Sequence, residues 1–128
     1  MNETKGQIED QISKAVTKFY AETLGVGPKE TRVYIIEDMI IIRLKGKLLP
    51  IEQKLLESRS GIKLIKDIRK ALHEITTKSI SVIIRKITSR KVVSSHSDIS
   101  TKTGEIVQIY ITDINLEEKI YLESPGKL

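Results

Sequence analysis

Residues 91–105, KVVSSHSDISTKTGE, hold the densest group of side chains in this chain that could bind a ligand or a partner. Within fifteen residues they include an imidazole, an aspartate, four serines and two threonines. We predict His96 as a pH-sensitive donor, Asp98 as the group that orients it, and residues 100–104 as a loop that contacts an anion or a partner. The full set of predicted binding residues is His96, Ser97, Asp98, Ser100, Thr101, Lys102, Thr103 and Gly104.

The same residues do not form a hydrolase triad. A triad needs a nucleophilic hydroxyl within reach of an imidazole that a carboxylate orients. Side chains alternate between faces along a strand, so His96 and Asp98 share one face, about 7 Å apart, and Ser95 and Ser97 point to the other. Only Ser94 shares the face of His96, and no glycine-flanked nucleophile is present. We therefore expect no enzymatic activity.

Two interpretations of the loop at residues 100–104 stay open. Its hydroxyls, its Gly and its Lys could cradle a small anion, or the hydroxyls could bond to the backbone and close an ordinary hairpin turn. The loop is not a phosphate-binding P-loop. His73 is the only other histidine, is expected as an exposed helix residue, and lies too far from His96 in sequence to suggest a metal site. We predict neither a metal nor a cofactor.

Positive charge is concentrated in residues 59–91. This segment has ten basic side chains and only two acidic ones, in a chain whose net charge is +5. Such a segment attracts polyanions or acidic membrane surfaces, although a solvated helix face would have the same composition. A nucleic-acid-binding module is therefore one alternative function. Four Tyr and one Phe leave little aromatic surface on which bases could stack.

Several absences indicate a small cytoplasmic protein. The chain has no Cys, and its first residues are polar, so we expect neither disulfides nor a signal peptide. Its longest apolar run, residues 39–42, is far shorter than the roughly 20 residues that cross a bilayer.

Hydrophobic periodicity predicts the elements in the first half. Residues 4–23 have apolar side chains at spacings of three and four, as in an amphipathic helix, with Thr4 as its N-cap. Residues 31–36 and 39–45 read as two strands of a tight hairpin. We expect Asp38 to adopt the positive φ that the turn requires.

The second half repeats this plan. Helices are expected at residues 50–58 and from about residue 62 to 88, with Gly61 between them. A second hairpin is expected at 91–97 and 105–111. The prediction is an α+β fold, helix–hairpin–helix–helix–hairpin, with a four-stranded antiparallel sheet and helices packed on one face. Residues 1–112 would form one domain and residues 113–128 an acidic C-terminal tail.

The two predicted hairpins together resemble a known family. Residues 25–50 read GVGPKETRVYIIEDMIIIRLKGKLLP and are followed by the motif at residues 91–105. Both are similar to the C-component (MpsC-like) family of the Na⁺-translocating, membrane-potential-generating system, over about residues 5–112. Leu49 departs from the pattern, because many members have Thr before the proline, where it would cap the next helix.

The resemblance implies a soluble accessory or regulatory protein that acts beside a bacterial membrane transport complex. The larger partners of this family are linked to the accumulation of dissolved inorganic carbon. A large membrane partner is therefore expected, and a homodimer could form through exposed hairpin edges. Besides nucleic-acid binding, the second alternative is a small-anion (bicarbonate) sensor centred on His96.

Overall fold

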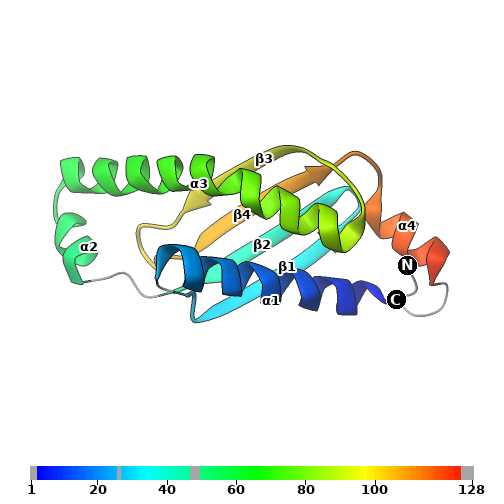
Figure 1. Ribbon diagram of the computed structural model, residues 1–128. Helices are drawn as coiled ribbons and strands as arrows, with labels where there is room; N and C mark the ends of the chain where they lie inside the picture. Colours follow the sequence, from blue (N-terminus) through cyan, green and yellow to red (C-terminus); the bar gives the residue numbers. More distant parts are fainter. Residues whose placement is uncertain (1–2, 26, 47–49, 125–128) are drawn as a thin grey trace.

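The computed structural model describes residues 3–25, 27–46 and 50–124 and confirms the α+β prediction (Figure 1). The departure noted at Leu49 lies outside these residues. The elements follow in the order α1 (Lys5–Leu24), β1 (Glu30–Ile36), β2 (Met39–Lys45), α2 (Pro50–Leu55), α3 (Arg59–Thr88), β3 (Val92–Ile99), β4 (Ile106–Thr112) and α4 (Leu116–Glu123).

All strand pairs are antiparallel, and the strand order is β1-β2-β4-β3. The two hairpins therefore meet along β2 and β4, and β1 and β3 form the edges. Figure 1 shows α1 and α3 lying across one face of this sheet, while the N-terminal turns of α3 extend beyond it toward α2. No described helix lies over the other face, which we call the open face.

The first helix forms as the sequence predicts. The Thr4 hydroxyl accepts the Gln7 amide at 3.1 Å, and the Gln7 side chain accepts the Thr4 amide at 2.9 Å. Gly25, with φ 77°, ends the helix in a left-handed C-cap. Glycine adopts this conformation without the steric cost that a Cβ would bring.

The core lies between the helices and the covered face of the sheet. Ile40 and Ile42 of β2 pack there with Ile80 and Ile84 of α3, and all four are fully buried. Side chains alternate along a strand, so the neighbours of these β2 residues, Met39 and Ile41, lie on the open face.

The prediction for the first hairpin turn was wrong in one respect. Glu37, not Asp38, has positive φ, at 55°. The backbone of Glu37 is held from α4: its amide donates to the Glu117 carboxylate at 3.1 Å, and its carbonyl accepts the Glu117 amide at 3.0 Å. The positive φ was expected at Asp38 on local propensity. Glu37 adopts it instead, and contacts from the distant helix α4 help to hold it there.

Gly61 does not separate two helices but lies in the first turn of α3. Ser58 caps this helix, and its hydroxyl accepts the Gly61 amide at 3.0 Å. A Cβ on Gly61 would lie 1.8 Å from the carbonyl oxygen of Leu55. The glycine thus permits the close approach of α2 to the start of α3.

Residues 113–124 are part of the domain rather than a separate tail. Residues 116–123 form α4, capped by the Asn115 side chain, which accepts the Glu118 amide at 3.0 Å. Leu116 and Ile120 are buried in the main core. These two apolar residues dock the helix despite its acidic composition.

Candidate functional site

His96 and Asp98 lie on the open face, as the alternation of side chains in a strand predicts. The strand register there aligns three rows of residues across the sheet. From β1 to β3, the rows are Ile36–Met39–Ile111–Ser94, Tyr34–Ile41–Ile109–His96 and Arg32–Arg43–Val107–Asp98.

The first two rows are mainly apolar, whereas the third carries charges. On β1, Tyr34 is 36% exposed and Ile36 is 45% exposed. Arg43 donates to the Glu105 carboxylate at 2.8 Å, so its charge is partly compensated. The open face is thus an apolar surface bordered by His96, Asp98 and a charged pair.

The loop at residues 100–104 is closed on itself by hydrogen bonds. The Ser100 hydroxyl accepts the amides of Lys102 and Thr103, at 3.2 and 3.3 Å. The Gly104 amide donates to the Ser100 carbonyl at 2.8 Å, and the Thr103 hydroxyl accepts the amide of Glu105 at 3.2 Å. These amides are the donors that an anion cradle would need, so the geometry matches a hairpin turn closed by hydroxyls.

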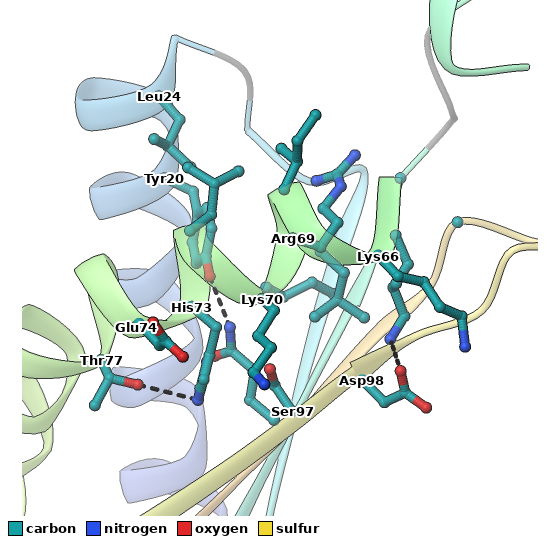
Figure 2. Close-up of a pocket in the computed structure, with 18 of the residues that line it drawn as sticks. Tyr20, Leu24, Lys66, Arg69, Lys70, His73, Glu74, Thr77, Ser97 and Asp98 are labelled. Atoms are coloured by element: carbon teal, nitrogen blue, oxygen red, sulfur yellow. Dashed lines mark hydrogen bonds between the residues drawn. The ribbon is translucent and has the colours of Figure 1, made fainter. Parts of the chain in front are cut away.

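The Asp98 carboxylate does not contact His96 through a described hydrogen bond; it accepts the Ile99 amide at 2.8 Å (Figure 2). His96, Ser97, Asp98, Lys102 and Thr103 are exposed, whereas Gly104 is buried. The proposed orienting role of Asp98 and the binding role of the whole set remain predictions.

A cleft of about 900 Å³ lies on the covered face, where α3 passes over the ends of β2, β4 and β3. The C-terminal end of α1 forms another wall, with Tyr20 and Leu24. Figure 2 shows Lys70 and His73 of α3 reaching down toward Ser97 of β3. This cleft combines apolar walls with polar side chains.

His73 lines this cleft rather than lying exposed on the helix surface. Its Nε2 lies 3.1 Å from the Thr77 hydroxyl and 3.4 Å from the Ser95 hydroxyl, and these two oxygens are 3.3 Å apart. Nδ1 is buried and has no hydrogen-bond partner among the described residues. Burial lowers the pKa of the imidazole; Glu74 opposes this effect and His96 adds to it.

A second polar group lies deeper in the core. The Gln108 side-chain amide donates to the Tyr20 hydroxyl at 2.7 Å, and the Tyr110 hydroxyl donates to the Gln108 carbonyl oxygen at 3.1 Å. Burial raises the pKa of the Tyr110 phenol, so it remains a donor. The His73 and Tyr110 rings are 6.2 Å apart, which places the two polar groups side by side.

Ion pairs compensate part of the positive charge of the basic segment. Lys63 pairs with Asp67 at 2.6 Å, Arg69 with Glu52 at 2.6 Å, and Arg90 with Asp113 at 2.9 Å. Other cations of α3 point toward the cleft or toward solvent. The nucleic-acid alternative therefore has no specific geometric support, and it remains a prediction.

Sequence reasoning missed the cleft and the role of His73 in it. His73, Thr77 and Lys70 share one helix face at spacings of three and four, and they continue the face that Ile80 and Ile84 bury. Polar residues on the buried side of this helix were the feature of the sequence that could have indicated the cleft. Their partners on β3 and β4 could be identified only once the strand order was known.

Comparison with known proteins identifies the family. Residues 4–114 match the family described as Na⁺-translocating membrane potential-generating system (MpsC). The chain is 39% identical, over 120 residues, to a Bacillus subtilis (strain 168) protein described as uncharacterized protein YbcI, and the match covers 94% of this chain and 97% of that protein. No solved structure matches.

Within the described residues, no helix is both long and apolar enough to cross a membrane. The family resemblance seen in the two hairpins is confirmed over nearly the whole of the domain. The chain belongs to the MpsC family of the Na⁺-translocating membrane potential-generating system.

Proposed function

We propose that this protein is a non-catalytic, cytoplasmic accessory subunit of a bacterial ion or inorganic-carbon transport system. In this proposal it docks through its open face on an integral membrane partner. The observation that carries the proposal is the apolar character of the open face in a member of a family named for a membrane system.

Two features support the open face as the docking surface. Isolated apolar side chains are normal on protein surfaces, but contiguous rows of them mark interaction sites. Ile36, Met39 and Ile111 form one such row, and Tyr34, Ile41 and Ile109 the next. The two segments that carry the family resemblance supply three of the four strands of this face. His96 and Asp98 would then lie at the edge of the interface.

Recovery of the partner from membranes tests this function. The tagged protein is expressed in its own organism, the membranes are solubilised in a mild detergent, and bound proteins are identified by mass spectrometry. We expect an integral subunit of an ion-translocating system to be recovered. Tyr34→Asp should reduce its recovery at least about tenfold, because a charge would enter the apolar interface at an aromatic position.

Tyr121→Asp is the matched control. Tyr121 is 49% exposed on α4 and lies outside the three rows, so this variant should recover the partner as the wild type does. Circular dichroism establishes that both variants are folded. Recovery of only unrelated proteins, or undiminished binding by the folded Tyr34→Asp variant, would contradict the proposal.

We also propose that a second copy of the chain covers the outer side of α3. Large apolar residues on that side recur at heptad spacing: Ile68, Ile75 and Val82 are 48%, 72% and 47% exposed, and Leu64 and Ala71 lie beside them. Such a stripe is typical of the seam between paired helices.

Charge favours an antiparallel pair. The stretch 63–74 contains both acidic side chains, Asp67 and Glu74, together with four basic ones, whereas the stretch 78–86 contains only basic ones. Two antiparallel copies would place acidic residues of one helix near basic residues of the other. This arrangement differs from the homodimer expected from the sequence, which would form through exposed hairpin edges.

The mass of the protein in solution tests the dimer. Light scattering at about 50 μM should give twice the chain mass, since apolar seams of this length support micromolar association. Ile75→Asp should give a monomer. Ile51→Asp, at a position 70% exposed on α2 and off the stripe, should remain dimeric. A monomeric wild type would exclude the α3 pairing without affecting the open face.

A further inference from the structure

We propose that the cleft under α3 binds a small, partly apolar organic monoanion, with its negative group at Lys70, His73 and Ser97 and its apolar body between α1 and the sheet. This site is separate from the open face, and it does not depend on the proposed docking of a membrane partner. Its volume, about 900 Å³, is in the range of small-molecule sites.

The cleft exists because the sequence interrupts the core there. Toward its C-terminal end, the inner side of α3 carries Ile80 and Ile84, which fill the space above the sheet. Closer to its N-terminal end, the same side carries Lys70 and His73. Small side chains on β3, among them Ser97, face them where larger residues would close the gap. A cavity lined by apolar side chains alone stays dry, whereas this one offers polar partners to a ligand.

Several donors in the cleft have no partner. The side chains of Lys70 and Ser97 form no hydrogen bond or ion pair with any other described residue, and His73 Nδ1 is buried without a partner. If the Nε2 of a neutral imidazole accepts the Thr77 hydroxyl proton, the ring carries its own proton on Nδ1. A buried donor without an acceptor is costly, and a bound carboxylate would satisfy it.

The charged side chains around the cleft favour a ligand with one negative charge over a ligand with two. Of the acidic side chains that line the cleft, Glu52 pairs with Arg69 and Asp67 pairs with Lys63. Glu74 also lines it and has no ion-pair partner among the described residues, so it would repel a dianion such as phosphate. A monoanion held by Lys70 meets less repulsion.

Apolar residues form the rest of the wall. Leu24, Leu44, Ile99 and Ile106 come from α1, β2, β3 and β4, respectively, and surround the space beyond the polar group. A ligand with a short alkyl or aromatic body can bury it there, since burial of apolar surface is favourable. The polar and apolar regions together specify the chemical class: a small amphipathic carboxylate.

Titration of the purified protein with hexanoate, followed by amide and methyl NMR, tests this inference. We expect saturable shifts at Ile99, Ile106 and the His73 ring, with a Kd on the order of 1 mM for a ligand of this size. Hexanamide, which lacks the charge, should bind at least about tenfold more weakly.

Variants distinguish the site from nonspecific binding. Lys70→Met should weaken hexanoate binding about tenfold, because it removes a charge-assisted contact. The matched variant Lys78→Met, on the same helix but outside the cleft, should bind as the wild type does. Ser97→Leu should place a bulky apolar side chain where the carboxylate would bind and weaken the shifts, while the spectrum of a folded protein is kept.

Three results would overturn the inference: no cleft shift up to about 50 mM hexanoate, equal affinity of Lys70→Met and wild type, or stronger binding of inorganic phosphate than of hexanoate at the same residues. None of them affects recovery of the membrane partner, so the two proposals fail or succeed separately.

Discussion

At the scale of single residues, His73 has the most unusual surroundings. Its Nε2 contacts two hydroxyls, while its Nδ1 is buried without a partner. Burial lowers the pKa of the ring, so the neutral form is favoured in the folded protein near pH 7. Protonation would place a charge in a partly buried site, and this would cost stability unless an anion were bound there.

Stability should therefore fall as the pH decreases through the range where histidine titrates. In the unfolded chain His73 titrates near its usual pKa of about 6.5, and in the folded protein it titrates at a lower pH. Above about pH 6.5 His73 is neutral in both the folded and the unfolded protein, and its titration does not change the free energy of unfolding. Below that pH the unfolded chain takes up the proton first, so the free energy of unfolding decreases until the pH falls below the pKa of His73 in the folded protein.

Urea unfolding at pH 7.5 and pH 5.5 measures this effect. The wild type should lose more stability between these values than His73→Gln, whose side chain does not titrate. The carboxylates of Asp113 and Glu117 act in a separate window: hydrogen bonds from Arg90 and Lys5, respectively, lower their pKa values, so their contribution is lost only at more acidic pH. An identical pH dependence in the variant would exclude His73 as the cause.

At the scale of elements, α3 serves three surfaces at once. One side buries Ile80 and Ile84 in the core, the same side lines the cleft at Lys70 and His73, and the outer side exposes Ile75. A helix of 30 residues can do this because its N-terminal turns extend beyond the sheet (Figure 1). Its first turn is positioned by the contact of Gly61 with α2.

Gly61→Ala should destabilise the protein, by about 1–3 kcal/mol, because the new methyl group would overlap the Leu55 carbonyl and displace α2 or the start of α3. Gly6→Ala is the matched control. A Cβ at Gly6, in the first turn of α1, has no heavy atom within 4 Å, so alanine should raise stability by about 0.5–1 kcal/mol. Chemical denaturation measures both values; equal effects of the two substitutions would contradict the contact.

At the scale of the whole molecule, α4 connects helix α1 with the turn between β1 and β2. Lys5 of α1 pairs with Glu117 at 2.9 Å, and Glu117 also bonds to the backbone of Glu37. The Ser124 hydroxyl donates to the Glu3 carbonyl at 3.3 Å, which brings the two ends of the described chain together. The acidic segment therefore contributes to the stability of the domain.

Leu116→Ala should cost about 2–5 kcal/mol, the usual loss for a leucine removed from a core. Leu122→Ala provides the comparison within the same helix, since Leu122 is 68% exposed and its loss should change stability by less than about 0.5 kcal/mol. Thermal and urea unfolding of the two variants measure the difference. If both substitutions were neutral, α4 would be only loosely attached.

Sequence periodicity predicted the elements from α1 to β4 and the faces of the strand side chains, because helix and strand periodicities depend on near neighbours; α4 lies where an acidic tail was expected and was missed. From this periodicity the sequence predicted correctly that His96 and Asp98 share a face opposite Ser95 and Ser97. It also determined the family, through two long motifs. The proposed binding role of the polar loop stays a prediction, since local pattern alone left both an anion cradle and a hairpin turn open.

Features that depend on residues far apart in the chain became visible only in the folded protein. The pairing of β2 with β4 aligned Tyr34, Ile41, Ile109 and His96 in one row, and the passage of α3 over β3 created the cleft at His73. The contact of Glu117 with Glu37 likewise has no local signal. Strand order and helix docking follow from the burial of the whole apolar surface, which no short segment specifies.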